Sequence, residues 1–261
     1  MKSSQPAIEL EHVSLRYRVP HEKVYSVKEY AIRWLKRSLR YSELWALRDV
    51  SFELRPGEVF GIVGRNGAGK TTLLKVIARV LMPTSGRVVV RGLVAPLLGL
   101  GAGFNHELTG RENVFLSGAT LGFPVQEIQA RFDEIVAFSG IGSFLDAPLR
   151  TYSTGMRARL AFAVATAVRP DILLLDEILS VGDSGFQEKC VDRLRGFREG
   201  GATVLVVSHN AGTIRSLCDR AILLHRGEVQ NLASAADVLQ QYEGLKGGVV
   251  DTRMAPAASG P

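Results

Sequence analysis

A glycine-rich loop between a strand and a helix constrains the fold of this chain more than any other sequence feature. Residues 64–71 read GRNGAGKT and fit the pattern G-x-x-x-x-G-K-[ST]. The apolar run 59–63 predicts a buried strand before this loop, and residues 71–78 predict a helix directly after it. In that context backbone N–H groups point at phosphate oxygens, and the helix N-terminus adds positive potential. The loop therefore predicts binding of a nucleoside triphosphate.

The residues of this phosphate loop have separate expected roles. Lys70 would reach the β- and γ-phosphates, and the Thr71 hydroxyl would hold Mg²⁺. The other residues expected to contact the nucleotide are Gly64, Asn66, Gly67, Ala68, Gly69 and Thr72. An ordinary glycine-rich turn is the alternative, and the flanking strand and helix argue against it.

A second motif is expected beside the loop. Residues 172–177 read ILLLDE, four apolar residues followed by two carboxylates. The pattern places both acids at the carboxyl end of a buried strand, where Asp176 would hold Mg²⁺ and Glu177 would act as general base on water. Similar runs also occur at helix N-termini, but together with the phosphate loop this one predicts nucleotide hydrolysis.

Composition and patterning indicate a mixed α/β chain. With 261 residues, 46% of them hydrophobic, it is able to bury a sizeable core. Alternating stretches predict an antiparallel layer at residues 7–18, 47–54 and 86–91. Continuous apolar runs predict buried strands at residues 59–63, 172–175 and 204–207. A mostly helical block at residues 109–168, with breaks at 122–124 and 146–148, predicts an inserted subdomain.

Other features of the whole sequence exclude classes of protein but indicate no particular function. No stretch reaches the roughly 18 uninterrupted apolar residues of a membrane span, and residues 1–5 show no signal-peptide pattern. The net charge of +6 selects no partner by itself. Cys190 and Cys218 have neither metal-ligand nor disulfide-framework spacing, so we expect buried structural thiols.

A third motif, YSTGM at residues 152–156, precedes a predicted helix at 157–168. Ser153 is suited to cap that helix, and Gly155 leaves a backbone N–H open to an anion. Taken alone, the motif is simply a good N-cap. Its position one helix before the Asp176 strand, together with the order of all the motifs, resembles the nucleotide-binding subunit of ABC transporters, from the first strand to about Tyr242.

The resemblance implies a fold and a set of further site residues. Residues 64–71 resemble the Walker A loop, residues 173–176 the Walker B strand, with Glu177 as the catalytic glutamate, and residues 180–183 (SVGD) the D-loop, so Asp183 is expected near the nucleotide. His209 resembles the switch histidine that contacts the γ-phosphate; in isolation it would be a plain loop histidine. The implied fold class is α/β, an ABC ATPase with a P-loop core, an antiparallel β layer and an inserted helical subdomain.

The same resemblance implies boundaries and an assembly. We expect the ATPase domain at 1–246, its helical subdomain at about 94–168, and a disordered tail at 247–261. A head-to-tail homodimer is expected, in which ATP bound by Lys70 and Thr71 of one subunit is capped by Ser153 and Gly155 of the other. ATP and Mg²⁺ are the expected cofactors.

Three features are similar to one branch of this family, the exporters of O-antigen, teichoic acid and capsule. They are YSTGM in place of the common LSGGQ, the stretch LGLGAGF at 98–104 followed by TGREN at 109–113, and an insertion at 19–46. The branch implies that the ATPase dimer binds two copies of a membrane-spanning permease. The permease would move a lipid-linked polysaccharide, and O-antigen is the substrate we expect. It also implies peripheral attachment to the cytoplasmic face of the inner membrane and no nucleic-acid partner.

The insertion has the pattern of a basic amphipathic helix. Apolar residues recur at helical spacing at Val24, Val27, Ala31, Trp34, Leu35 and Leu39, and the basic face carries Lys28, Arg33, Lys36, Arg37 and Arg40. It would form a gate helix near the membrane surface, or else a solvated helix packed on its own domain. Just before it, Tyr17 is our candidate for stacking on adenine, with a core aromatic as the alternative.

Two departures from the family pattern limit the resemblance. No glutamine occurs between Arg87 and Val125, although ABC ATPases usually place a Mg²⁺-contacting glutamine there. The sequence also stops before any carbohydrate-binding domain of the kind that some O-antigen members carry. A soluble ABC ATPase of DNA repair or translation, or the ATPase of another ABC transporter class, remains an alternative function.

Overall fold

The structure is a computed structural model that describes residues 5–20, 41–97, 101, 103–176, 183–208 and 211–247. Several sequence predictions fall on the other residues. They are the gate helix predicted from about Val24 to Arg40, the general base Glu177, most of the D-loop (180–182), the switch histidine His209 and the tail from 248 onward. Of the predicted insertion at 19–46, the structure describes only the two ends, and it places 19–20 in one strand and 41–46 in the next.

The smaller sheet is an antiparallel layer of three strands in the order β2-β1-β4. It consists of β1 (Ile8–Pro20), β2 (Tyr41–Leu54) and β4 (Ser85–Val90), and β1 pairs antiparallel with both neighbours. The predicted antiparallel layer is therefore confirmed. Both β1 and β2 run further toward the insertion than the alternation predicted, because the two strands pair with each other as far as Pro20 and Tyr41.

The larger sheet has six strands in the order β5-β6-β7-β3-β8-β9. The strands are β5 (Val94–Leu97), β6 (Ile172–Asp176), β7 (Thr203–Val207), β3 (Val59–Val63), β8 (Arg220–His225) and β9 (Glu228–Ser234). All neighbours are parallel except β8 and β9. Because β3 and β6 run in the same direction, both carboxyl ends meet the same edge of the sheet, which is where ligands bind in open α/β folds.

Both faces of the larger sheet are covered, which explains why its central strands are continuously apolar. In β6, Ile172 and Leu174 pack into a core shared with α2 (Lys70–Ile77) and the antiparallel layer. Leu173 and Leu175 pack on the opposite face, in a core shared with α7 and α9. The helices of that second face are α7 (Ser184–Glu199), α8 (Ala211–Leu217) and α9 (Ala235–Gly247).

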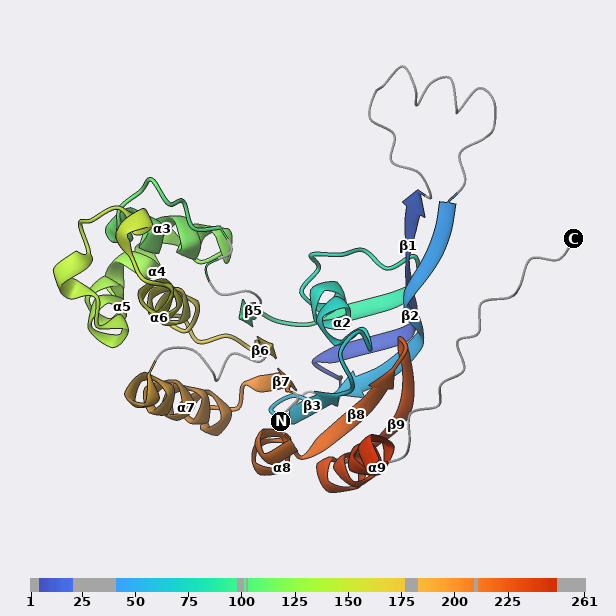
Figure 1. Cartoon of the computed structure of the whole chain (residues 1–261). Helices are drawn as coiled ribbons and strands as arrows, with labels where there is room; N and C mark the ends of the chain where they lie inside the picture. Colours follow the sequence, from blue (N-terminus) through green and yellow to red (C-terminus); the bar gives the residue numbers. More distant parts are fainter. Residues whose placement is uncertain are drawn as a thin grey trace, which may run out of the picture.

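Four helices and two short 3-10 segments form a second lobe, beyond β5 and β6 in Figure 1. They are α3 (Gly110–Thr120), α4 (Val125–Ala130), α5 (Phe132–Ser139), η1 (Gly142–Phe144), η2 (Leu149–Thr151) and α6 (Thr154–Ala165). Their own buried cluster includes Val114, Ile128, Ile135 and Leu160. The inserted helical subdomain and its breaks are therefore confirmed, although α6 begins and ends three residues earlier than the predicted 157–168. The expected start at about residue 94 was wrong, because β5 (Val94–Leu97) pairs with β6 in the larger sheet and the first helix of the lobe is α3.

The two cysteines are buried, free thiols, as predicted. Cys190 lies on α7 and Cys218 directly after α8, and both belong to the core on that face of the sheet. Burial raises the pKa of each thiol to about 12, so both stay protonated at neutral pH.

Candidate functional site

The phosphate loop follows β3, and two of its glycines leave no room for a side chain. A Cβ on Gly64 would lie 2.3 Å from the Leu224 carbonyl oxygen. Gly69 has a φ of +104°, and a Cβ there would lie 2.6 Å from the Ala46 carbonyl oxygen. Glycine is therefore required at both positions, one for close backbone approach and one also for its left-handed conformation. The loop also contacts the turn between β8 and β9, where the Ala68 carbonyl oxygen accepts a hydrogen bond from the Gly227 N–H at 2.9 Å.

Lys70 is buried inside this loop, with only 7% of its surface exposed. Its ammonium group donates to the carbonyl oxygens of Gly64 at 2.9 Å and Arg65 at 3.2 Å, so the loop curves around the charge. Lys70 is also the first residue of α2, whose N-cap is Gly69 and carries no side-chain hydrogen bond. The N-terminal N–H groups of α2 and a buried cation thus face the same hollow, an arrangement that stabilises phosphate oxygens.

Thr71 and Asp176 meet at the edge of the same hollow. The Thr71 hydroxyl donates to the Asp176 carboxylate at 3.2 Å, although 105 residues separate them in the sequence. Asp176 reaches this position because it is the last residue of β6, at the sheet edge where β3 also ends. A hydroxyl and a carboxylate side by side are the oxygen donors that Mg²⁺ takes from proteins, so these two residues fit the expected metal.

A pocket of about 700 Å³ contains most of the predicted nucleotide contacts. Predicted residues that line it are Tyr17, Asn66, Gly67, Ala68, Gly69, Lys70, Thr71, Thr72 and Asp176. Its remaining walls are Leu44, Trp45 and Ala46, which the sequence analysis did not assign to the site. These three residues lie on β2, at the C-terminal end of the insertion at 19–46, and no local pattern marks them as nucleotide contacts. The pairing of Tyr17 with Leu44 in the β1–β2 register brings them there.

Ser153 and Gly155 do not line this pocket. They stand at the N-terminus of α6 in the helical lobe, where the Ser153 hydroxyl accepts a hydrogen bond from the Met156 N–H at 3.1 Å. The preceding Tyr152 is buried and donates to the Phe144 carbonyl oxygen at 2.6 Å; burial raises the pKa of its hydroxyl. A Cβ on Gly155 would meet only the Ser153 hydroxyl, at 3.8 Å, so the space over this helix end is open.

Asp183 also lies away from the residues that line the pocket. Its carboxylate caps α7 by accepting the Phe186 N–H at 2.9 Å, and it forms an ion pair with Arg159 of α6. The Phe186 hydrogen bond lowers the pKa of Asp183, and the Arg159 charge lowers it further. In one subunit Asp183 therefore joins α6 to α7, and its contact with nucleotide stays a prediction.

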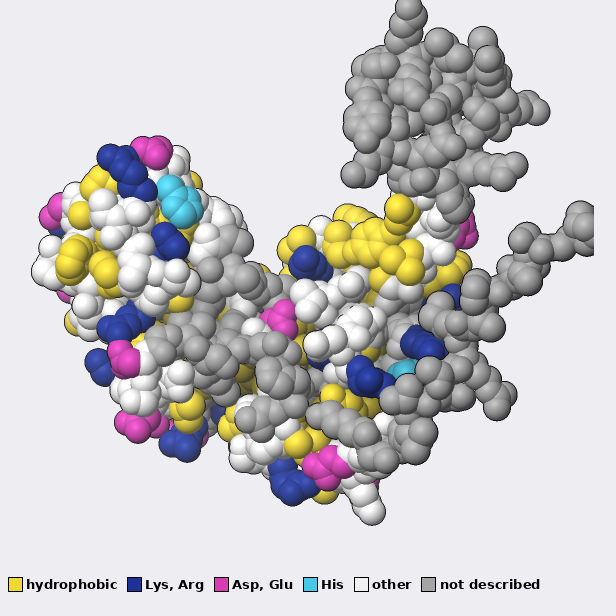
Figure 2. Space-filling model, viewed as in Figure 1, with side chains coloured by type: hydrophobic (Ala, Val, Ile, Leu, Met, Phe, Trp, Pro, Cys, Tyr) yellow, Lys and Arg dark blue, Asp and Glu magenta, His cyan; other side chains and the backbone are white. Residues whose placement is uncertain are grey.

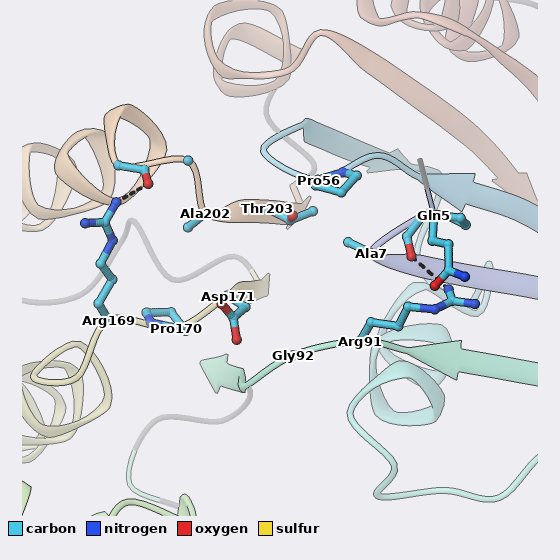
Figure 3. A pocket seen from close by; sticks show the side chains of 13 residues that line it. Gln5, Ala7, Pro56, Arg91, Gly92, Arg169, Pro170, Asp171, Ala202 and Thr203 are labelled. Carbon is cyan, nitrogen blue, oxygen red and sulfur yellow. Dashed lines mark hydrogen bonds between the residues drawn. The ribbon is translucent and has the colours of Figure 1, made fainter. Parts of the chain in front are cut away.

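A second pocket, of about 390 Å³, opens at the amino ends of the strands, opposite the phosphate loop (Figure 3). Asp171 precedes β6 there and Thr203 begins β7. Two arginines flank it, but both bind backbone carbonyls: Arg91 donates to Pro6 at 2.8 Å and Arg169 to Gly200. This pocket contains neither the glycine loop nor the helix end that phosphate binding requires.

Fold and pocket together define a P-loop nucleotide-binding protein with an inserted helical lobe. The sequence model of the family described as ABC transporter matches residues 47–180. The chain is 42% identical to the O-antigen export system ATP-binding protein RfbB of Klebsiella pneumoniae over 241 residues, which cover 91% of this chain and 98% of that protein. It is 39% identical to the teichoic acids export ATP-binding protein TagH of Listeria monocytogenes over 236 residues, 90% of this chain and 69% of the relative.

Solved structures agree with these sequence matches. A dimeric bacterial ABC transporter cassette superposes with a TM-score of 0.67 at 25% identity, covering 87% of this chain and 98% of that chain. An ATP-binding subunit of an ABC transporter has the same fold, with a TM-score of 0.70 at 22% identity over 94% and 96% of the two chains. The chain belongs to the ABC transporter family of ATPases. Within the described residues, no helix combines the length and apolarity needed to cross a membrane.

Proposed function

We propose that this chain is the ATP-hydrolysing subunit of an exporter that moves lipid-linked polysaccharide, most of all O-antigen, across the inner membrane. The observation that carries the proposal is the match to the Klebsiella O-antigen export ATP-binding protein over 98% of that protein's length. The teichoic acids export relative supports the same branch. The YSTGM motif and the insertion at 19–46, quoted above, point in the same direction.

Hydrolysis would take place in the pocket beside α2. Lys70 would bind the β- and γ-phosphates, and Tyr17 would stack on the base. Thr71 and Asp176 would hold Mg²⁺, which when bound neutralises charge that develops on the phosphates. Glu177 follows Asp176 directly and would take a proton from the attacking water, while His209 would contact the γ-phosphate. The hydrogen bond between Thr71 and Asp176 supports this assignment because it joins both metal-binding residues in one place.

The complete site would need two copies of the chain. Ser153 and Gly155 lie outside the pocket that contains Lys70, so they would act on the nucleotide of a partner subunit in a head-to-tail homodimer. Donors on the far side of the γ-phosphate would then hold the dimer closed until hydrolysis removes that group. Asp183 would come near the nucleotide only in this closed dimer.

The assembly would continue into the membrane. Two ATPase subunits would bind two copies of a membrane-spanning permease at the cytoplasmic face of the inner membrane, and the polysaccharide would pass through the permease rather than this chain. The insertion at 19–46 would supply a gate helix there. It belongs to an ATPase domain at 1–246, which is followed by the tail at 247–261. This function includes no nucleic-acid partner.

The test is a gene deletion with complementation in the source bacterium. Cells without this chain should lose polysaccharide from the surface and accumulate lipid-linked glycan inside, as measured by surface staining and by mass spectrometry of extracted lipid. The wild-type chain should restore export. The Glu177→Gln variant should not, because without its general base it would bind ATP but hydrolyse it slower by orders of magnitude. Normal surface polysaccharide in the deletion strain would contradict the proposal.

A further inference from the structure

A cavity of about 330 Å³ opens between α7 and α8, on the face of the larger sheet opposite α2. Leu175 of β6 and Val206 of β7, which are register partners, form part of its floor. Val59 of β3 and Val204 of β7, also register partners, lie beside them. All four expose only 3 or 4% of their surface, so the cavity reaches down to the sheet. In Figure 1 the two helices lie below the larger sheet, and Figure 2 shows hydrophobic side chains beside charged ones along this lower edge of the molecule.

The lining of this cavity changes from apolar at the sheet to cationic and polar at the helices. Arg195 and Arg198 on α7 are exposed and line it. The other lining residues of the two helices are Val191, Leu194, Thr213, Ser216 and Leu217. Among the described residues that line the cavity, none is acidic. An apolar floor beside two cations suits a molecule that has an aliphatic chain and an anionic head.

Both arginines are able to bind a further anion although each already has a partner. Arg195 lies 3.1 Å from the Asp192 carboxylate, and Arg198 lies 3.4 Å from that of Asp219. All four side chains are between 45% and 72% exposed, so water weakens these two ion pairs. A guanidinium group carries five N–H donors, more than one carboxylate uses. An anionic head at the mouth of the cavity therefore finds donors on both arginines.

The size of the cavity also fits a small ligand. Protein interiors are close-packed, with few voids larger than a water molecule, and small-molecule sites have volumes of roughly 300–1,000 Å³. We propose that the cavity between α7 and α8 binds an amphiphile with a single aliphatic chain and a carboxylate head. The chain lies on the floor formed by Leu175 and Val206, and the carboxylate binds Arg195 and Arg198.

Octanoate is the probe that tests this site. Calorimetric titration measures its Kd, and the thermal midpoint of the protein is measured in parallel, because a ligand that binds only the folded state raises it. Octanoate should bind and raise the midpoint. Acetate has the head without the chain, and octylammonium has the chain with the opposite charge, so neither should raise it. Absence of octanoate binding, or equally tight binding of octylammonium, would overturn the proposal. These titrations need neither ATP nor a permease, so they are independent of the proposed transport function.

Variants of α7 locate the probe. The double variant Arg195→Gln, Arg198→Gln should bind octanoate roughly tenfold more weakly, because both cations beside the head are lost. Arg215→Gln is the matched control and should bind like the wild type: this exposed arginine of α8 also pairs with a carboxylate, Glu243 at 3.8 Å, but does not line the cavity.

Val191→Phe should abolish octanoate binding, because the larger side chain fills space that the aliphatic chain would take. Unchanged octanoate affinity in Val191→Phe would overturn the proposal, and so would unchanged affinity in the double arginine variant. If Val191→Phe does not fold, the arginine variant decides, because it changes only exposed side chains.

Discussion

The N-termini of α2 and α6 differ in what satisfies their backbone N–H groups. At α2 the N-cap is Gly69, which has no side chain, and the helix end faces the hollow with the buried Lys70 ammonium. At α6 the N-cap is Ser153, whose hydroxyl accepts the Met156 N–H within the same subunit. The N-terminus of α2 therefore leaves its backbone N–H groups open to an anionic ligand. The N-terminus of α6 is already capped within one subunit, so only its solvent-facing side remains for contact with a partner.

A third helix makes the difference clearer. At α3 the Thr109 hydroxyl accepts the Glu112 N–H, and the Glu112 carboxylate accepts the Thr109 N–H at 2.8 Å, a complete capping box. These hydrogen bonds lower the pKa of Glu112, which keeps it ionised and an effective acceptor. Side chains thus cap α3 and α6 of the helical lobe, whereas α4 and α5 have no side-chain cap. The missing cap at α2 points to a ligand only because the buried Lys70 ammonium and the glycine loop lie at the same helix end.

The largest expected effect is the removal of the cation at α2. Lys70→Ala should lower ATPase activity by about a hundredfold or more, because a preorganised charge at the phosphates is lost from a buried site. Lys75→Ala changes an exposed lysine in the last turn of the same helix and should leave activity unchanged. Steady-state phosphate release by the purified protein measures both variants. Wild-type turnover by Lys70→Ala would show that α2 does not bind the phosphates.

The next expected effect concerns the partner role of α6. In a head-to-tail dimer, Lys70→Ala on one chain and Ser153→Ala on the other fall on the same site and leave the second site whole. Both changes on one chain damage both sites, one through each residue. The number of ATP molecules bound per mixed dimer should therefore be higher for the first arrangement. Equal occupancy in the two mixed dimers would argue that Ser153 serves its own subunit only.

The smallest expected effect is the loss of the cap at α3, where no ligand is involved. Thr109→Ala should lower the free energy of unfolding by about 1 kcal/mol, as typical N-cap removals do, and should leave the Kd for ATP unchanged. Chemical denaturation and calorimetric titration measure the two quantities. Thr109→Ser keeps a hydroxyl acceptor and should stay near wild-type stability. A clear change in ATP affinity for Thr109→Ala would break the distinction between the helical lobe and the phosphate loop.

Features with a local physical cause were predictable from the sequence. The glycine pattern at 64–71 requires the backbone that the structure shows, because Gly64 and Gly69 tolerate no Cβ. The apolar run 172–175 predicts a strand covered on both faces, and the structure packs its residues alternately into two cores. Ser153 was recognised as a cap, but α6 begins at Thr154 rather than Arg157 because the helix starts directly after its N-cap.

Strand pairing decided what the sequence pattern could not. Leu44 and Trp45 carry no motif, and they line the pocket only because the β1–β2 register places them beside Tyr17 and the phosphate loop. The short strand β5 and the antiparallel edge strand β9 were not predicted either, since a four-residue segment and a half-exposed edge give weak periodicity.

The sequence by itself determined the chemistry of this protein, and the tertiary structure determined how its parts meet. A glycine loop with Lys70, and an apolar strand ending in Asp176, predict which groups would contact phosphate and metal, because backbone freedom, charge and hydroxyl chemistry are properties of single residues. The hydrogen bond between Thr71 and Asp176, the Tyr17–Leu44 pair, and the separation of Ser153 from the pocket are properties of distance. Contacts between distant segments depend on the sum of many packing and pairing energies over the whole chain, and no short segment encodes that sum.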